Sequence, residues 1–139
     1  LLDVFERTDL RSTTLNPAPE LQGIGIQTKA LKQATLTNNQ SSAATIKEYP
    51  ALAGKGLSIK YKIVRGTTDR TGELIISAST NGVSYDDTYT ESGADVGVTL
   101  SAVMENKDST AGNETVALQY TTTNTGTAAT LEYQTTILV

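Results

Sequence analysis

The sequence contains no histidine, no cysteine and no tryptophan. Without imidazole or thiolate groups, the chain cannot build the zinc sites, the Ser-His-Asp or Cys-His catalytic groups, or the disulfide framework that depend on them. No apolar run approaches the length that a helix needs to cross a bilayer, and there is no signal-peptide pattern. Carboxylates, hydroxyls, amides and guanidinium groups remain as the candidates for chemistry.

Aromatic side chains are also scarce, at 5% of the 139 residues. Apolar residues make up 37% and charged residues 19%, both below the average for globular proteins. Thr, Ser, Gly and Asn fill the difference, which is typical of a sheet protein with many hydroxyl groups facing solvent and untypical of a helical bundle. The length suits one domain with a hydrophobic core of its own.

Positive charge is nearly missing from the second half of the chain. Residues 1–70 carry ten Lys and Arg against six Asp and Glu, a net charge of +4. Residues 71–139 carry Lys107 alone against nine acidic residues, a net charge of −8. Because the whole chain is acidic, we expect no nucleic-acid binding. We interpret the asymmetry as basic strands lying beside acidic strands, within one subunit or between subunits.

Residues 1–20 are expected to form a short helix followed by a Pro-rich linker. The chain begins at Leu1 with no Met, so we interpret it as a fragment of a longer protein. Leu2 and Phe5 are three residues apart and share one helical face. So short a helix either packs on its own domain or ends an upstream trimeric coiled coil, and we favour the second. Leu2 and Phe5 are then candidate trimer contacts, and Pro17 ends the helix.

Residues 21–139 are expected to form a β-sandwich. Leu57, Ile59, Tyr61 and Ile63 alternate with more polar residues, as on a half-buried strand. The same alternation runs over 74–78, 96–104, 116–122 and 131–139. A polar loop is expected over 66–72, and Asn81-Gly82 predicts a hairpin. About eight or nine strands at this spacing indicate an all-β antiparallel sandwich of jelly-roll-like type.

The last strand stays apolar to its final residue. A free chain end is usually polar, so this pattern predicts burial either within the domain or against another copy of the chain. Ile137 and Val139 are therefore candidate trimer contacts.

The acidic residues suggest neither catalysis nor a metal centre. Asp86 and Asp87 are adjacent, so a regular strand would direct them to opposite faces, which is poor geometry for a pair flanking a glycosidic bond. Calcium is the alternative use of Asp86, Asp87, Glu91 and Asp95, which follow no EF-hand spacing. We expect no catalytic residues, no metal and no cofactor.

Two arginines form the remaining candidate site. Arg65 and Arg70 bracket a Thr-rich loop, and guanidinium groups offer paired donors to carboxylate or phosphate. They predict an anion site in a cleft between subunits. The alternative is that they form ion pairs with acidic residues of the second half.

Four stretches together resemble a segment near the C-termini of tailed-phage virion proteins. They read LSIKYKIVRGTTDRTGELIIS, YDDTYTE, GVTLSAV and VALQYTTTNTGTAATLEYQTTIL, within residues 57–139. These virion proteins are trimeric tail fibres, spikes and needles, and the chain looks most like the distal knob of the tail needle of short-tailed phages. The resemblance implies a trimer of jelly-roll subunits similar to tumour-necrosis-factor-like folds. Such needles are trimeric coiled coils that plug the portal channel and lead through the host envelope during DNA ejection.

The resemblance implies a non-enzymatic role at the distal tip of the virion. The expected partners are two identical chains, phage portal or tail proteins through an upstream region, and the host cell envelope. The alternative is the receptor-binding tip of a tail fibre that recognises surface saccharide, for which six Tyr and many hydroxyl and amide groups would serve. A capsule hydrolase is least favoured, since the chain lacks His and Cys and its acids are dispersed.

Overall fold

The computed structural model describes residues 26–28, 31–50, 55–80, 82–105 and 114–138. These residues form antiparallel strands and loops, which confirms the all-β expectation. No helix long and apolar enough to cross a membrane occurs among them. The helix and linker expected over 1–20, with the trimer contacts Leu2 and Phe5, lie outside the described residues, as does Val139.

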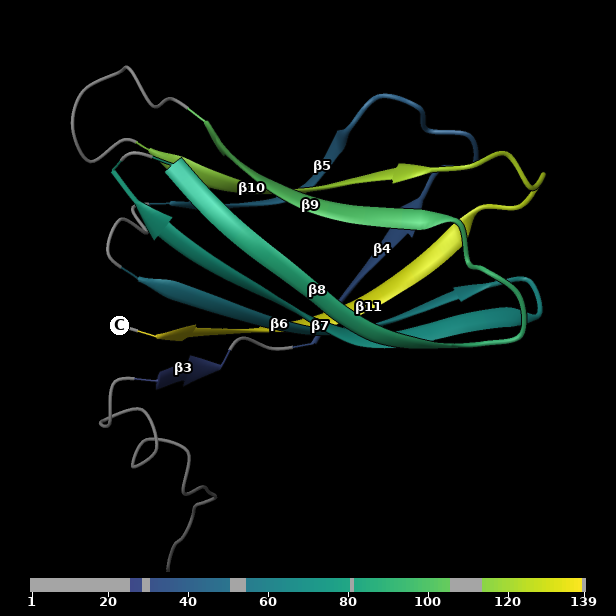
Figure 1. The fold of residues 1–139 in the computed structure, drawn as a ribbon, viewed down its shortest axis with the longest axis horizontal. Coiled ribbons are helices and arrows are strands. Elements are labelled where there is room, and N and C mark those ends of the chain that lie inside the picture. The colour runs from purple at the N-terminus through teal and green to yellow at the C-terminus, as the bar shows by residue number, and fades with distance from the viewer. Residues whose placement is uncertain (1–25, 29–30, 51–54, 81, 106–113, 139) are drawn as a thin grey trace, which may run out of the picture.

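The described part of the chain contains nine strands (Figure 1). In chain order they are β3 (Ile26–Thr28), β4 (Lys32–Leu36), β5 (Ala44–Pro50), β6 (Gly56–Arg65), β7 (Thr68–Ser79), β8 (Gly82–Ser92), β9 (Val98–Glu105), β10 (Thr115–Thr122) and β11 (Ala129–Leu138).

The strands form two sheets of unequal size that lie face to face (Figure 1). The larger sheet has the order β3-β11-β6-β7-β8, and β4 also pairs with β11. The smaller sheet has the order β5-β10-β9. The chain passes from one sheet to the other four times, between β4 and β5, β5 and β6, β8 and β9, and β10 and β11. As a result β8 and β9, adjacent in sequence, are edge strands of different sheets within the described structure.

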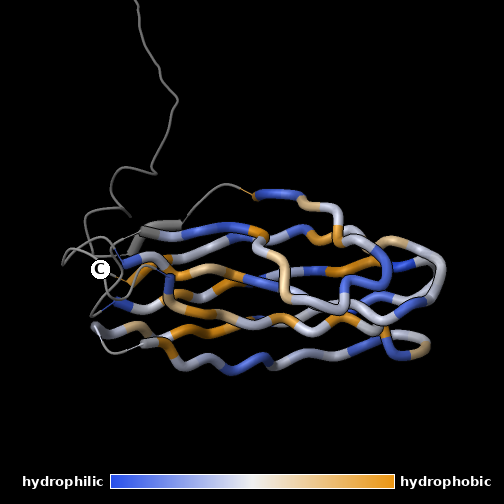
Figure 2. The backbone as a smooth tube through the Cα atoms, turned by 90° about the horizontal axis from the view of Figure 1, so that it is seen from above, coloured by the Kyte–Doolittle hydropathy of each residue, from blue (hydrophilic) through white to orange (hydrophobic). Residues whose placement is uncertain are grey.

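The core lies between the sheets and follows the alternation expected from the sequence. Hydrophobic and hydrophilic positions alternate along the strands (Figure 2). The inward rows of β6, β7, β10 and β11 are buried, and the corresponding row of β9 is supplied by Val98, Leu100 and Ala102, with Val96 buried just before the strand. The largest fully buried side chains are Leu36, Ile59, Ile63, Leu74, Ile76, Val96, Val116, Leu118 and Leu131. Thr135 enters this core because its hydroxyl bonds to the Tyr49 hydroxyl at 2.7 Å.

The loop expected over 66–72 is wrong. The turn is confined to Gly66 and Thr67, with Gly66 at φ +62°, and β7 already begins at Thr68. The polar composition of this stretch resembles a loop, but Arg70 occupies an inward position that a hydrophobic residue would normally take. It is 2% exposed and lies opposite Ile63 on β6 and Glu91 on β8. A charged residue in the buried row therefore conceals a strand from pattern analysis.

The expected hairpin is confirmed as the pairing of β7 with β8, although Asn81 lies outside the described residues. Strands β7 and β8 pair antiparallel from Asp69–Ser92 at one end to Ser79–Gly82 at the other. Gly82 has φ +145°, a backbone conformation that favours glycine. The opposite orientations expected for Asp86 and Asp87 also hold, because Asp86 is exposed and Asp87 is half-buried on the inward row.

The apolar final strand is explained by its central position. β11 lies between β6 on one side and β3 and β4 on the other, so its apolar residues are needed within the subunit. Ile137 faces the core and is 9% exposed. Its role as a trimer contact stays a prediction. Leu138, which faces the opposite way, is 51% exposed and is the residue of this strand that presents apolar surface outward.

Candidate functional site

The inward row of β8 is unusual because it is not fully covered. Tyr85, Asp87, Tyr89 and Glu91 share this row, since their partners Ile76, Leu74, Gly72 and Arg70 form the inward row of β7. Tyr85 and Tyr89 are nevertheless 47% and 45% exposed. The three-stranded sheet is narrower than the sheet it faces, so the edge strand β8 extends past its cover. We call Tyr85, Asp87, Tyr89 and Glu91 the edge row.

The carboxylate of Asp87 is tied to the core through a tyrosine. The Tyr61 hydroxyl on β6 donates a hydrogen bond to Asp87 Oδ1 at 2.7 Å. Burial raises the pKa of Asp87, and the hydrogen bond from Tyr61 and the charge of Arg70 oppose that rise. The pKa of Tyr61 is raised strongly, by burial first and by Asp87 second. The hydrogen bond from Tyr61 therefore fixes the Asp87 carboxylate in place as a hydrogen-bond acceptor at the edge of the sheet.

The ring of Tyr89 is held by the ion pair of the buried Arg70 with the partly buried Glu91. Arg70 donates from Nε and Nη2 to Glu91 Oε2 at 3.0 and 2.8 Å, and the same oxygen accepts from the Val96 amide at 3.1 Å. The Arg70 Cζ lies 3.9 Å from the centroid of the Tyr89 ring. Glu91 fixes the guanidinium of Arg70, and the guanidinium stacks on one face of the Tyr89 ring. The orientation of this ring is therefore fixed.

Gly72 on β7 leaves room for the side chains of Tyr61 and Tyr89, which lie on the neighbouring strands β6 and β8. A Cβ placed at Gly72 would lie 2.6 Å from Tyr89 Cβ and 2.8 Å from the Tyr61 hydroxyl oxygen. Real side chains do not tolerate such contacts, so any larger residue would displace Tyr61 or Tyr89. The glycine is thus required by the close packing around the edge row.

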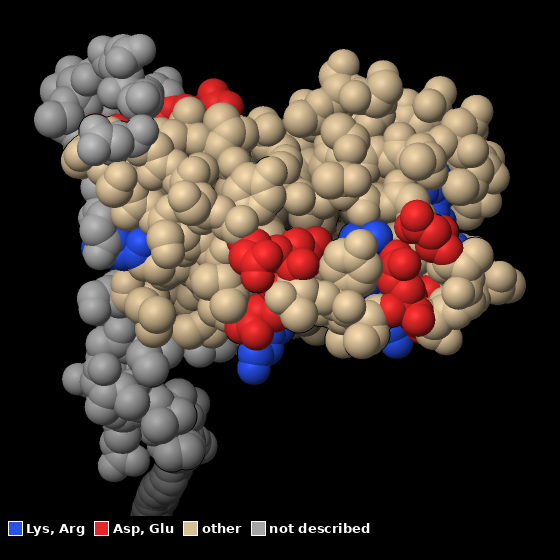
Figure 3. Space-filling view, in the orientation of Figure 1, with Lys and Arg blue, Asp and Glu red and all other residues tan. Residues whose placement is uncertain are grey.

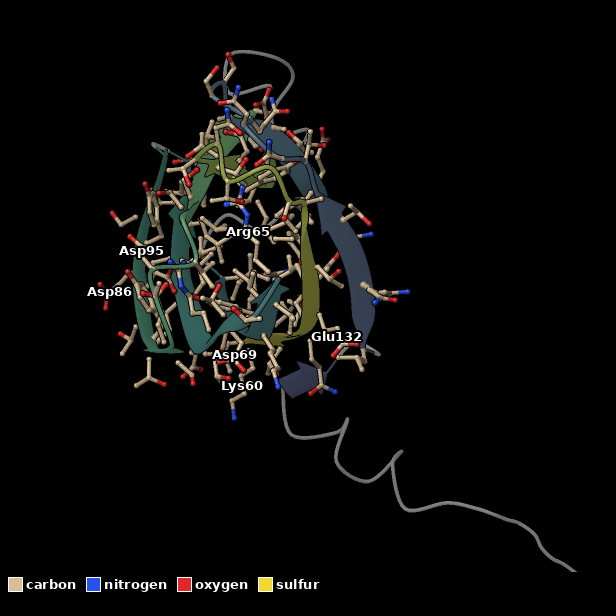
Figure 4. All side chains as sticks on the ribbon, turned by 90° about the vertical axis from the view of Figure 1, so that its right-hand side faces the viewer. Lys60, Arg65, Asp69, Asp86, Asp95 and Glu132 are labelled. Carbon is tan, nitrogen blue, oxygen red and sulfur yellow. The ribbon has the colours of Figure 1, made fainter. Side chains whose placement is uncertain are left out.

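Arg65 lies apart from the edge row, at the end of the sandwich. Its side chain points inward between the sheets (Figure 4) and is 4% exposed. It donates to five acceptors from separate loops, and none of them is a carboxylate. These are Thr127 O at 2.8 Å, Val96 O at 3.0 Å, Gly97 O at 3.2 Å, Asn38 Oδ1 at 2.7 Å and Thr123 O at 2.6 Å.

The two arginines singled out from the sequence therefore have separate surroundings. Arg70 forms an ion pair with Glu91, which is the alternative that the charge asymmetry suggested. Arg65 is bound by backbone carbonyls and an asparagine. An anion site between subunits stays a prediction for both. In a single chain, both guanidinium groups are already engaged by protein acceptors.

The remaining acids of this edge do not converge. Acidic side chains gather along β8 and the segment that follows it (Figure 3), and Asp86 and Asp95 point outward there (Figure 4). Asp95 accepts a hydrogen bond from the Gly97 amide at 2.7 Å, whereas Asp87 and Glu91 are engaged as described above. No group of three acidic side chains suited to a metal ion occurs among the described residues. The edge row offers aromatic rings and hydrogen-bond acceptors.

The buried tyrosines predict that the fold weakens in alkaline solution. Burial raises the pKa of Tyr49, Tyr61 and Tyr133, so the folded chain keeps their protons at a pH where the unfolded chain releases them. Their contribution to stability is complete below the unfolded pKa of about 10 and is lost as the pH rises above it. We expect the free energy of unfolding, from urea titrations, to fall as the pH rises above about 10. Tyr61→Phe should reduce that slope, and an unchanged slope would contradict the role of Tyr61.

Comparison of the chain with models of protein families, with curated proteins and with solved structures gives no match. The features of the molecule that bear on function are the sandwich, its exposed apolar residues and the edge row. The edge row was missed in the sequence, although the Tyr-x-Asp-x-Tyr spacing at Tyr85, Asp87 and Tyr89 is a detectable signal for one strand face.

Proposed function

We propose that the chain is the non-enzymatic, homotrimeric tip of a phage tail needle, which contacts or penetrates the host cell envelope during genome ejection. The resemblance of residues 57–139 to virion proteins supports this proposal, as does the antiparallel sandwich. On this proposal the chain lies at the distal end of the virion. Its upstream region joins portal or tail proteins.

The observation that carries the proposal is apolar surface on the outer face of the larger sheet. Ile75 and Leu138 are each 51% exposed on β7 and β11. Val64, 43% exposed on β6, lies apart from them, beyond the exposed Lys60 and Lys62. The Leu138 side chain lies over Gly56, within 3.7 Å of where a Cβ would stand. Ile75 pairs with Ser58, two residues along β6 from Gly56. Exposed apolar residues on one sheet face favour contact with another subunit.

The strand pairing supports a jelly-roll-like subunit within this proposal. β4 pairs with β11 in the larger sheet, and β5 pairs with β10 in the smaller sheet. The segment β4-β5 therefore runs antiparallel to the segment β10-β11 through both sheets, as the two arms of the long hairpin do in a jelly roll. The meander β6-β7-β8 is a departure from the regular jelly-roll pairing. We propose that three such subunits associate as in tumour-necrosis-factor-like trimers.

The proposal predicts the mass of the particle in solution. We expect light scattering and native mass spectrometry to give three times the chain mass of 14.7 kDa. Ile75→Asp and Leu138→Asp, combined, should shift the particle toward monomer, because each places a charge on apolar contact surface. Thr99→Asp, at an exposed position on β9 of the smaller sheet, is the matched control and should stay trimeric. A folded monomer at high concentration of the unaltered chain would refute the proposal.

The second candidate function is a fibre tip that recognises surface saccharide. It is favoured by the half-exposed rings of Tyr85 and Tyr89, which flank the carboxylate of Asp87 on one strand face. Both candidates place the chain in contact with the host envelope. They differ in whether the contact needs a defined sugar.

A further inference from the structure

We propose that Tyr85, Asp87 and Tyr89 form a binding site for neutral saccharide on the open edge of the sandwich. The inference rests on the proposed contact with the host envelope for its biological setting.

The two rings have the spacing of separate binding positions. Residues on one face of a strand recur every second position, so Tyr85 and Tyr89 are roughly 14 Å apart along β8, with Asp87 midway between them. Each keeps almost half of its surface exposed, at 47% and 45%. A tyrosine presents an apolar ring face together with a polar hydroxyl. That combination suits the apolar face and the hydroxyl rim of a sugar ring.

The site is held in place before any ligand arrives. The Arg70 guanidinium stacks on Tyr89 at 3.9 Å and is itself fixed by Glu91. The Tyr61 hydroxyl holds the carboxylate of Asp87 at 2.7 Å. Because these groups need little further ordering, a ligand would lose less of its binding free energy to fixing them.

The charges of this edge select the kind of sugar. An ionised carboxylate accepts hydrogen bonds and donates none, so Asp87 suits the hydroxyl groups of a saccharide. Asp86 and Asp95 point outward beside the edge row (Figure 4). Their negative charge disfavours phosphorylated, sulfated or sialylated sugars. The inferred ligand is therefore a neutral oligosaccharide.

The test uses the full chain and three neutral probes, namely lactose, maltotriose and chitotriose. Backbone amide NMR spectra are recorded as each probe is added up to about 10 mM, the weak range expected of a single small site. We expect at least one probe to shift signals of β8 and of its neighbours on β7. Tyr85→Ala and Tyr89→Ala should each weaken that binding roughly tenfold. Tyr85→Phe keeps the ring and should retain most of it.

Matched controls separate the site from general effects. Leu31→Ala removes an exposed apolar side chain just before β4, outside both the edge row and the proposed trimer surface, and it should leave sugar binding unchanged. The inference is overturned if no probe binds, or if binding survives both Tyr→Ala changes in folded protein. It is also overturned if the polycation spermidine binds at β8 and the sugars do not, because the edge would then be a site for positive charge. Oligomeric mass is measured on the same samples. A trimer that binds no sugar refutes this site alone, and a monomer that binds sugar refutes the needle-tip proposal alone.

Discussion

Replacing Arg65 by methionine is expected to destabilise the folded chain by about 3–5 kcal/mol. The change keeps much of the apolar length of the side chain but removes every donor to five acceptors in the loops at one end of the sandwich. A buried acceptor that is left without any donor retains the full cost of desolvation. Gly97 O, Thr123 O and Asn38 Oδ1 keep other donors, so the loss is concentrated on the remaining acceptors. Because small domains are stable by about 5–15 kcal/mol, the loss would be a large share of the total. Urea unfolding followed by circular dichroism measures it.

Lys62→Met is the matched control for Arg65→Met. Lys62 is exposed on the same strand β6, so the control should change stability by less than about 0.5 kcal/mol. The loss of stability in Arg65→Lys should lie between those of the other two variants, because an ammonium group has three donors and cannot reach all five acceptors at once. If Arg65→Met and Lys62→Met have equal effects, the loops are not held by this side chain.

Replacing Glu91 by glutamine is expected to have the second large effect, a loss of about 3 kcal/mol. The change keeps the size of the side chain but removes the carboxylate that is ion-paired with the guanidinium of Arg70, which is 2% exposed, and leaves only the charge of Asp87 to compensate it among the described residues. An uncompensated charge in a buried position is more costly than the absence of the whole pair. Thermal and urea unfolding measure the loss, and near-ultraviolet circular dichroism reports the order of the Tyr89 ring.

Two variants make this second prediction specific. Asp95→Asn neutralises an exposed acid in the segment after β8 and should have little effect. The double change Arg70→Met with Glu91→Leu replaces the pair by apolar groups and should recover part of the stability that Glu91→Gln loses, reduced by the cost of the Val96 amide that loses its acceptor. Equal stability of Glu91→Gln and Asp95→Asn would show that the ion pair contributes nothing to the fold.

Most of the sandwich follows from the spacing of apolar residues. The alternation from Leu57 to Ile63 and from Val116 to Thr122 identifies strands and their buried faces, since side chains on a strand point alternately to its two faces. The order of strands in the sheets does not follow, because pairing partners such as β4 and β11 are remote in sequence and leave no local signal.

The surroundings of the arginines and the edge row could not be predicted from the sequence, for a different reason. Arg65 and Arg70 are polar residues in buried rows, and their partners are backbone carbonyls or acids on distant segments. A local pattern treats both as exposed and therefore suggested a ligand for them. The edge row was missed because the exposure of Tyr85 and Tyr89 depends on the narrow width of the opposite sheet, which is a property of the assembled fold.

The carboxylates along β8 also have a consequence for how copies of the chain meet. Within the described residues, β8 ends the larger sheet, and such an edge invites another strand to add to it and extend the sheet into a fibre. An incoming β8 from a second copy would bring Asp86 and Asp87 against the same two acids, and mutual repulsion opposes that contact at neutral pH. The acids of β8 therefore disfavour growth of the larger sheet by addition of further copies at this edge.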